Sequence, residues 1–380
     1  MSSAFGEHRG KHAELAPRSD RHAAAANQTN PLLQCTVGLA ELRHSIDAPE
    51  PRHRRTVRDD ANGRLVLTDL PLLAQRWRVL RALARGAFSQ LVCIEDTFSP
   101  LLVTPTAGGQ RHHDVYAAKV MNAEYSAIGL RESARLQALA VENRWRASGR
   151  APILGFHSCF RFHGHVCIVT ELLGADLESV LRNPAPVDVV ATRSALEEAA
   201  AATATAAPAA ATAAPRAVSF AALRAVATQL LAALLLLQRA DTVHADLKPS
   251  NIVFDNARSP RRPLRLFRAG AHGEARSEVG AETRGEAGAL ERLKLKLVDF
   301  GNAFKTAEAE TLGYGGAAGC VAQSLRYRAP EVLLQLRGAQ WYCGALDMWS
   351  LGCTLAEMRL GRPLFEARDE VSLTFYFIYR

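Results

Sequence analysis

The stretch HADLKPSNIVF, residues 244–254, decides the fold and the chemistry expected of this chain. It brings a carboxylate (Asp246), an ammonium (Lys248) and an amide (Asn251) onto one short segment. Phosphoryl transfer needs a cation on the phosphates, oxygen ligands for a metal, a carboxylate at the acceptor hydroxyl and a backbone cover. Because Asp246 and Asn251 are five positions apart, a base and a metal ligand would be fixed relative to each other. The stretch therefore predicts a catalytic loop for phosphoryl transfer.

Three further charged residues supply the remaining parts of such a site. Lys119 lies in the strand-like VYAAKVM (115–121), where a rigid backbone can aim its ammonium at phosphates. Glu132 follows 13 residues later in a helical pattern, where it can hold that lysine extended by an ion pair. Asp299, in the strand-like LKLVDFG (295–301), offers a second metal-binding carboxylate. Each of these residues alone is an ordinary surface charge, and only the ordered set indicates function.

Composition places the chain among ordinary globular proteins. Its 380 residues allow two domain-sized units or one two-lobed domain with tails. Hydrophobic residues make up 48% and charged residues 22%, which is enough for a sizeable core. The net charge of +8 comes from scattered basic residues and favours acidic partners only weakly. The seven cysteines contain no CxxC pair, so they indicate reduced thiols in an intracellular protein.

Targeting and membrane segments are not predicted. The first 30 residues are polar and carry many charges, unlike a secretory signal. The uncharged stretch 199–215 consists of Ala, Thr and Pro and is too weakly apolar to span a bilayer. We therefore expect no membrane anchor and a location in the cytoplasm or the nucleus.

The composition and the hydrophobic periodicity of the sequence change at several points along the chain. Residues 1–75 show no sustained periodicity and predict a disordered tail. Strands are expected on both sides of a glycine-containing turn in 77–98 and again in 165–173, with a helix over 128–141 between them. Helices are expected further along, over 220–238, 345–361 and 370–380, the first of them buried on most sides. Two low-complexity insertions interrupt this pattern, at 185–217 and 257–292. Strands followed by helices predict an α+β protein with two lobes.

Four motifs in order make a family resemblance plain. They are HADLKPSN (244–251), DFG (299–301), RAPE (328–331) and DMWSLGC (347–353). Over roughly residues 77–365 the chain resembles a eukaryotic protein kinase. The sequences SLRYRAPEVLL and DMWSLGC are most similar to those of the CMGC group. Within this group the chain most resembles the branch of dual-specificity tyrosine-regulated, homeodomain-interacting, CDC-like and SR-protein kinases. The resemblance implies a β-rich N-lobe (76–170), a hinge (171–177) and a helical C-lobe (178–380).

The resemblance also implies roles for the charged residues. Asp246 would be the catalytic base and Lys248 would neutralise charge on the transferring phosphate. Asn251 and Asp299 would hold Mg²⁺. Lys119, with Glu132 as its partner, would contact the α- and β-phosphates of ATP.

Further nucleotide-binding positions follow from the same resemblance. Thr170 falls at the gatekeeper position beside the adenine, and Asp176 falls near the ribose. Ser324 and Arg328 would shape the substrate-binding end of the activation segment, and Asp347 would brace the catalytic loop. The complete set of additional cofactor-binding positions is Leu83, Gly86, Leu91, Ala117, Thr170, Glu171, Leu173 and Asp176.

For several of these positions a purely structural role explains the residue as well. Thr170 is equally explained as a buried β-branched strand residue, and Asp176 as a solvated loop aspartate. His244 is expected to be structural, packing behind the catalytic loop. The arginine-rich stretch RSPRRPLRLFR (258–268) has five arginines and no acids. It suits a nuclear-import signal or a contact with RNA or an acidic protein, or simply a solvated loop.

The chain departs from the family pattern in the phosphate-covering loop and in the activation segment. The loop reads ARGAFSQL (84–91), with Ala84 and Ser89 in place of two glycines, so weaker nucleotide binding is expected. Ala245 stands where many kinases have an arginine that pairs with a phosphorylated residue. Val321 stands where tyrosine-regulated relatives have their activating tyrosine. Both changes predict an activation segment held by packing rather than by a phosphate.

Kinases of this group continue beyond the position of Arg380 with several helices. We therefore expect an incomplete C-lobe with exposed apolar surface. Glu331 is expected to lack its usual arginine partner, and the loss of such a partner costs about 3–5 kcal/mol for a partly buried carboxylate.

The predicted function is a serine/threonine protein kinase that uses ATP and Mg²⁺. Its partner would be a protein substrate with a Ser or Thr acceptor, with Tyr left open, and a nucleic-acid partner is not expected. The alternative is a pseudokinase that acts as a binding or scaffold module, favoured by the altered glycine loop. A small-molecule kinase is disfavoured because RAPE and DMWSLGC belong to a segment that docks polypeptides.

Overall fold

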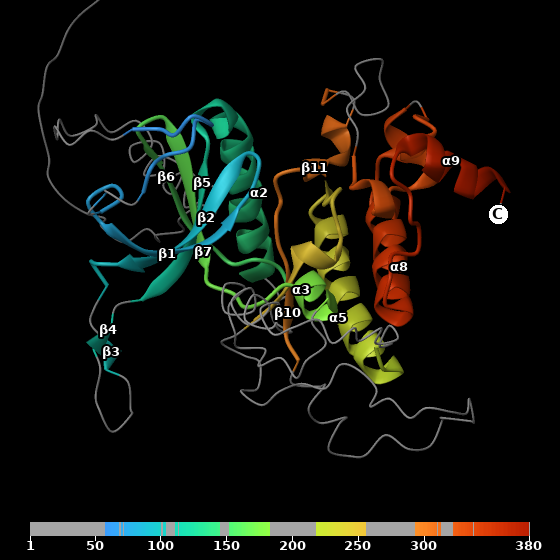
Figure 1. Ribbon diagram of the computed structural model, residues 1–380, viewed down its shortest axis with the longest axis horizontal. Coiled ribbons are helices and arrows are strands. Elements are labelled where there is room, and N and C mark those ends of the chain that lie inside the picture. Colours follow the sequence, from blue (N-terminus) through green and yellow to red (C-terminus); the bar gives the residue numbers. More distant parts are fainter. Residues whose placement is uncertain are drawn as a thin grey trace, which may run out of the picture. The chain divides into compact units, whose positions relative to one another are not determined.

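The computed structural model describes a large part of the chain, and all of these residues lie in one compact unit, Ser45–Arg380. The predicted insertions, the arginine-rich stretch 258–268 and Val321 lie outside the described residues. Figure 1 shows a sheet with one long helix, followed by a mainly helical part. The described residues are 58–67, 70, 72–99, 102–103, 111–112, 114–144, 152–182, 218–255, 293–309, 311–312, 322–336 and 338–379.

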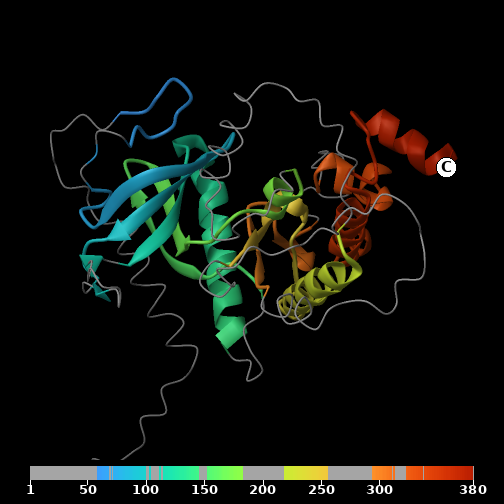
Figure 2. The same cartoon turned by 60° about the horizontal axis from the view of Figure 1, so that its bottom comes forward.

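A five-stranded antiparallel sheet forms the N-lobe, in the order β1-β2-β5-β7-β6. Helix α2 (Ser126–Arg144) packs against β7 and β6, as Figure 2 shows from a second direction. Six of the seven residues of β7 are buried, because α2 covers one face of the sheet and a cluster with Leu65, Leu73 and Trp77 covers the other. A short hairpin, β3 (Leu102–Val103) and β4 (Arg111–His112), lies between β2 and β5 in the sequence. The sheet strands are β1 (Trp77–Arg85), β2 (Ser89–Asp96), β5 (Val115–Met121), β6 (Phe156–Phe162) and β7 (His165–Glu171).

The predicted boundary between tail and N-lobe at residue 75 is wrong, because the described part of 58–75 belongs to the lobe. Leu65, Leu67 and Leu73 are buried in one cluster with Trp77 and the sheet. The side chain of Gln90 donates a hydrogen bond to the carbonyl of Leu65 at 2.6 Å. The three leucines stand among polar residues without the sustained periodicity of a strand or helix, so their burial depends on long-range contacts.

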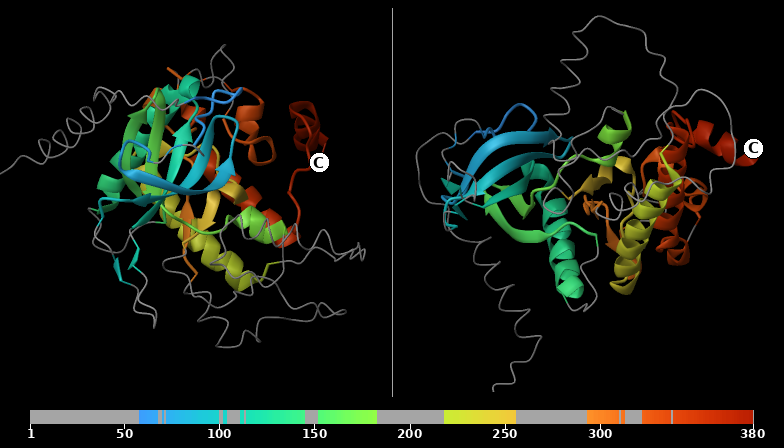
Figure 3. Two further views of the ribbon diagram at one scale, coloured as in Figure 1. Left: turned by 60° about the vertical axis from the view of Figure 1, so that its left-hand side comes forward. Right: turned by 90° about the horizontal axis from the view of Figure 1, so that it is seen from below.

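The C-lobe combines helices with two small two-stranded sheets. Strands β9 and β10 pair antiparallel, as do β8 and β11, and α5 packs against α8, β8 and β10. Figure 3 shows α5 and α8 from below. The helices are α3 (Leu177–Arg182), α5 (Phe220–Arg239), α7 (Pro330–Leu333), α8 (Ala345–Leu360) and α9 (Glu370–Tyr379). The strands are β8 (Thr242–Val243), β9 (Ile252–Phe254), β10 (Leu295–Leu297) and β11 (Phe304–Lys305), with single 3₁₀ turns at Ala123–Tyr125, Pro249–Asn251, Thr306–Glu308, Leu325–Tyr327 and Ala339–Trp341.

Helix α5 is the strongest apolar segment of the C-lobe. Ser219 caps its first turn by accepting a hydrogen bond from the N–H of Ala222 at 3.2 Å. Val226, Leu230 and Leu237 are fully buried on one side. The expectation of burial on most sides is wrong, because Leu231 and Leu235 on another side are each 45% exposed. By length and composition alone α5 is the one described helix that could cross a membrane. Its packing against α8 and β10 accounts for the apolar residues within the C-lobe core.

Helix α9 is anchored by aromatic packing. Leu373 is fully buried, and the ring of Phe377 lies 5.6 Å from Trp349 and 5.1 Å from Phe365. Val371 and Phe375 on the same helix are 65% and 56% exposed. Among the described residues, Glu331 forms no ion pair with a basic side chain.

Candidate active site

A cavity of about 330 Å³ lies where the sheet meets the catalytic loop. Its walls come from the β1–β2 turn, from β5 and β7, from the segment after β7, and from the ends of β9 and β10. Every residue that the sequence predicted to bind nucleotide or metal lines this cavity: Leu83, Gly86, Leu91, Ala117, Lys119, Glu132, Thr170, Glu171, Leu173, Asp176, Asn251 and Asp299.

Lys119 is held between two carboxylates at the back of the cavity. Its Nζ lies 2.8 Å from Oε2 of Glu132 on α2 and 2.8 Å from Oδ1 of Asp299. Burial disfavours the charged lysine, but the two carboxylates outweigh it and raise the pKa of Lys119 above its usual range. Burial likewise opposes ionisation of Asp299, but Lys119 outweighs it and lowers the pKa of Asp299 to about 2. Lysine and aspartate are therefore both charged at neutral pH.

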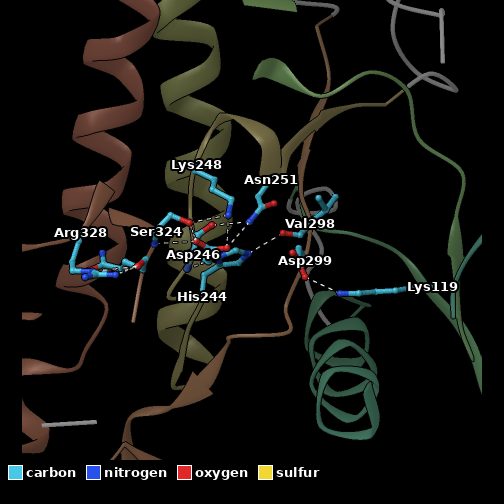
Figure 4. Close-up of polar contacts among 10 residues, drawn as sticks. Lys119, His244, Asp246, Lys248, Asn251, Val298, Asp299, Ser324 and Arg328 are labelled. Carbon is cyan, nitrogen blue, oxygen red and sulfur yellow. Dashed lines mark hydrogen bonds and ion pairs between the residues drawn. The ribbon is translucent and has the colours of Figure 1, made fainter. Parts of the chain in front are cut away.

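Asp246 lies at the centre of a polar cluster on the catalytic loop (Figure 4). Its Oδ2 accepts a hydrogen bond from Nζ of Lys248 at 2.8 Å. Its Oδ1 accepts one from the hydroxyl of Ser324 at 2.7 Å, and Lys248 also donates to that hydroxyl at 2.9 Å. The side chain of Asn251 donates to the carbonyl of Asp246 at 2.8 Å, which leaves its amide oxygen for other contacts. A carboxylate, a cation and an amide oxygen thus converge beside the cavity.

The catalytic loop is braced from behind by Asp347, a fully buried residue near the start of α8. Its two carboxylate oxygens accept the backbone N–H groups of His244 at 2.7 Å and Ala245 at 2.9 Å. Burial raises the pKa of Asp347, although His244 and these two donors oppose the shift. Ala245 has φ of +61° and Asp299 has φ of +64°, which is strained for non-glycine residues. The two hydrogen bonds to Asp347 offset the strain at Ala245 on the catalytic loop.

A sequence model of the protein kinase domain family matches residues 107–377, well over half of the 380 residues. The chain belongs to the protein kinase family. The match begins after β2, yet β1 and β2 complete the sheet of this kinase. The two-lobed α+β fold expected from the motifs is confirmed.

Curated relatives of this kinase are CMGC-type kinases at low identity. The serine/threonine-protein kinase Doa of Drosophila melanogaster is 25% identical over 336 residues, which cover 86% of this chain and 30% of that protein. Homeodomain-interacting protein kinase 2 of Mesocricetus auratus is 25% identical over 305 residues, covering 78% of this chain and 18% of that protein. Dual specificity protein kinase CLK2 of Homo sapiens is 25% identical over 325 residues, covering 84% and 50%. The chain therefore spans half or less of these relatives.

Burial bears on two positions for which the sequence left two interpretations open. Asp176 is 6% exposed, and its carboxylate accepts hydrogen bonds from the N–H and the hydroxyl of Ser179, both at 2.8 Å. It is therefore a buried cap of α3 that also lines the cavity, and not a solvated loop residue. Thr170 is 6% exposed and contributes to the cavity wall.

His244 is structural, as expected. Its Nδ1 accepts a hydrogen bond from the N–H of Asp246 at 3.2 Å, so the proton belongs on Nε2, which donates to the carbonyl of Val298 at 3.0 Å. Its ring meets Phe300 edge-on at 5.0 Å. His244 therefore links the catalytic loop to the segment after β10 that carries Asp299.

Ala245 lies inside an apolar cluster. It packs with Val243, Phe304 and Leu346, and with Ala322 and other residues at the end of the activation segment. Because Ala245 is fully buried there, an arginine at this position would have to displace packed side chains. The cluster supports the prediction that packing, rather than a phosphate, holds this segment.

The segment predicted as the hinge is fastened to β10 and to Gly155 through Glu171. The carboxylate of Glu171 accepts hydrogen bonds from Nζ of Lys296 on β10 at 2.5 and 2.6 Å and from the N–H of Gly155 at 2.5 Å. A Cβ on Gly155 would lie 2.6 Å from the Glu171 carboxylate, which explains a glycine there. The sequence placed Glu171 at the hinge but did not predict Lys296 as its partner.

Apolar walls of the cavity were also not predicted individually. They are single residues of strands, a helix and the segments that connect them, and only their positions beside Lys119, Thr170 and Asp299 distinguish them. A search for apolar residues flanking the motifs would have found two of them, Val253 and Val298. The full set is Leu136, Leu154, Ile168, Val253 and Val298.

The segment before β1 supports the phosphate-covering turn. The guanidinium of Arg64 donates a hydrogen bond to the carbonyl of Gly86 at 3.0 Å. The side chain of Asn122, after β5, donates to the carbonyls of Ala87 at 3.3 Å and Asn62 at 3.4 Å. This segment therefore restrains a turn in which Ala84 and Ser89 replace glycines.

Substitution of Arg64 by alanine is expected to raise the KM for ATP about 2- to 5-fold with a smaller change in kcat. One neutral-acceptor hydrogen bond contributes about 1 kcal/mol, and its loss lets the turn move away from the phosphates. Steady-state kinetics with varied ATP measures the effect. Arg78→Ala, which removes an exposed β1 arginine paired with Glu95, is the matched control. An equal rise of KM in both variants would contradict a specific role of Arg64.

Proposed function

We propose that this chain is a magnesium-dependent protein kinase that transfers the γ-phosphate of ATP to serine or threonine hydroxyls. The observation that carries the proposal is the convergence on one cavity of Lys119, Asn251 and Asp299, with Asp246 one hydrogen bond from Asn251. The relatives Doa, a serine/threonine-protein kinase, and CLK2, a dual specificity protein kinase, support the same activity.

The donor set fits a magnesium–nucleotide complex. No group of three or more His, Cys, Asp or Glu side chains that could hold a metal occurs among the described residues. Magnesium needs only one or two protein carboxylates when phosphates and water complete its shell. Asn251 and Asp299 would hold it, and it would supply charge neutralisation on the phosphates.

Each residue of the cluster would then carry one part of the transfer. Asp246 would orient the acceptor hydroxyl and take up its proton. Lys248, 2.8 Å from Asp246, would balance negative charge as the phosphoryl group moves. Lys119, kept extended by Glu132, would position the phosphates, so the protein contributes alignment and electrostatics rather than a covalent intermediate.

A pseudokinase that binds partners without transfer is the second candidate. It is favoured by Ala84 and Ser89 in the phosphate-covering turn, where glycines would let backbone N–H groups come closer to phosphates. The intact cluster around Lys119 and Asp246 favours the enzyme. Both candidates predict nucleotide binding, so transfer is the deciding measurement.

The test combines thermal unfolding with a transfer assay on the purified chain. Mg²⁺ and ATP together are expected to raise the unfolding temperature more than ATP with a chelator. Labelled γ-phosphate is expected to appear on serine or threonine of a generic basic protein, with the acceptor identified by mass spectrometry. A rise in the unfolding temperature without phosphate transfer would favour the pseudokinase. The absence of both effects would overturn the proposed nucleotide site.

Substitution of Lys119 by methionine is expected to lower the transfer rate by about 10²-fold or more. The fold should persist, because Glu132 can take up a proton when its partner is lost; burial already raises the pKa of Glu132. Lys305→Met, at an exposed position on β11, is the control. An unchanged rate in Lys119→Met would show that the lysine does not serve the phosphates.

The proposal includes the location of the protein and its acceptor residues. We place the protein inside the cell, in the cytoplasm or the nucleus, on the basis of its sequence and its relatives. Serine and threonine are favoured as acceptors over tyrosine, and a nucleic-acid partner is not expected.

A further inference from the structure

A second cavity, of about 470 Å³, lies beside the acceptor side of the catalytic cluster. Ser324 is one of its walls, and the hydroxyl of this residue contacts both Asp246 and Lys248. The cavity therefore lies close to the place where a polypeptide would present a hydroxyl to Asp246. The described residues that line it are Ser324, Leu325, Arg326, Tyr327, Ala367 and Arg368.

The charge of this cavity is one-sided. Arg326 and Arg368 both line it, both are exposed, and no acidic residue is among the described lining residues. Neither arginine forms an ion pair with another part of the chain that the structure describes. Arginine presents a planar set of donors that suits carboxylates and phosphates.

The neighbouring acids are engaged elsewhere. Glu370 pairs with Arg328 at 2.6 Å. Asp369 caps α9 by accepting the N–H and the hydroxyl of Ser372 at 2.7 Å. Glu357 on α8 accepts the hydroxyl of Tyr327 at 2.5 Å.

One acid still acts on Arg326 from a distance. Burial raises the pKa of the Glu357 carboxyl group, and the positive charge of Arg326 lowers it by less. Glu357 already accepts the hydroxyl of Tyr327 and forms no ion pair with Arg326 among the described residues.

We infer that Arg326 and Arg368 form a subsite for an anionic side chain, carboxylate or phosphate, next to the acceptor residue of the protein substrate. The inference rests on the proposed kinase activity and adds the substrate class. Leu325 and the ring of Tyr327 supply an apolar wall beside the two arginines, which suits the aliphatic part of an anionic side chain. A substrate with a lysine or arginine at that position would meet two like charges.

Peptide kinetics test the subsite. A neutral peptide with one serine acceptor is compared with versions carrying a single glutamate at each position from three before to three after the serine. Glutamate at one or two positions next to the acceptor is expected to raise kcat/KM about tenfold over glutamine. Phosphoserine at the same position should raise it further, and both advantages should shrink as salt is increased. A glutamate advantage without a phosphoserine advantage would assign the subsite to carboxylates.

Charge variants assign the effect to the two arginines. In the double variant R326E/R368E the preference should invert, so that a lysine peptide becomes better than the glutamate peptide. Arg362→Ala is the matched control, because this exposed arginine pairs with Glu366 and does not line the cavity. It should keep the full glutamate advantage. A glutamate advantage that survives in R326E/R368E, or that is absent from the wild-type chain, would overturn the inference.

A binding measurement separates this inference from the proposed activity. Fluorescence polarisation with labelled glutamate and glutamine peptides, whose serine is replaced by alanine, requires no transfer. Stronger binding of the glutamate peptide to the wild-type chain than to R326E/R368E supports the subsite even if no peptide is phosphorylated. Equal binding to both chains would overturn it even in an active kinase.

Discussion

Substitution of Asp246 by asparagine is expected to lower kcat about 10²- to 10⁴-fold, the range that general acid–base catalysis contributes. The amide has nearly the shape of the carboxylate, so it can still contact Ser324 and Lys248. It cannot take up the proton of an acceptor hydroxyl. KM for ATP should change little, because Asp246 does not line the nucleotide cavity. Phosphate transfer to a basic protein measures the effect.

Asp241→Asn provides the control for Asp246→Asn. Asp241 is exposed, lies five residues earlier and undergoes the same chemical change. Its variant should keep the wild-type rate, and both variants should unfold within a few degrees of the wild-type temperature. Full activity of Asp246→Asn in a folded chain would defeat the assignment of this residue as the base.

Substitution of Asp347 by alanine is expected to have the largest effect on stability. It leaves the buried N–H groups of His244 and Ala245 without an acceptor, at roughly 1–3 kcal/mol for each group. The total is a large part of the ~5–15 kcal/mol that stabilises a typical domain. The catalytic loop would also lose its position, so kcat should fall about 10²-fold at temperatures where the variant stays folded. Chemical denaturation and transfer assays measure the two effects.

Two other variants separate the brace from a general loss of charge. Asp347→Asn keeps one acceptor but turns an amide donor toward the second N–H, so it should lose less stability than Asp347→Ala. Asp369→Ala removes an exposed carboxylate that caps α9, at a cost of about 0.5–2 kcal/mol, and should leave kcat unchanged. Equal destabilisation by Asp347→Ala and Asp369→Ala would contradict the brace.

Local sequence patterns were sufficient for most elements of the fold. The expected strands and helices are present because each has its own signal, such as the continuous apolar run that became β7 and the Ser219 cap that begins α5. The catalytic cluster was predictable for a different reason. Phosphoryl transfer requires several charged groups in a fixed order, and Lys119, Asp246, Asn251 and Asp299 occur in that order.

The parts that were missed depend on contacts between distant segments. Leu65 and Leu73 are buried only because they pack against the sheet of the N-lobe. The pair Glu171–Lys296 joins residues 125 positions apart, and neither residue signals its partner. The exposed side of α5 was mispredicted because the sequence of the helix does not show on which sides other elements pack against its leucines.

The position of β1 and β2 decides where this kinase can be cut for expression. The family match begins at residue 107, but β5 pairs with β2 along its whole length, from Val115 to Met121. A fragment that begins at residue 107 would present a bare strand edge to other chains, which invites aggregation. It would also remove Trp77 and the three leucines that pack with it, and so expose Val120 and Val169 on the remaining strands. Soluble fragments should begin before residue 58.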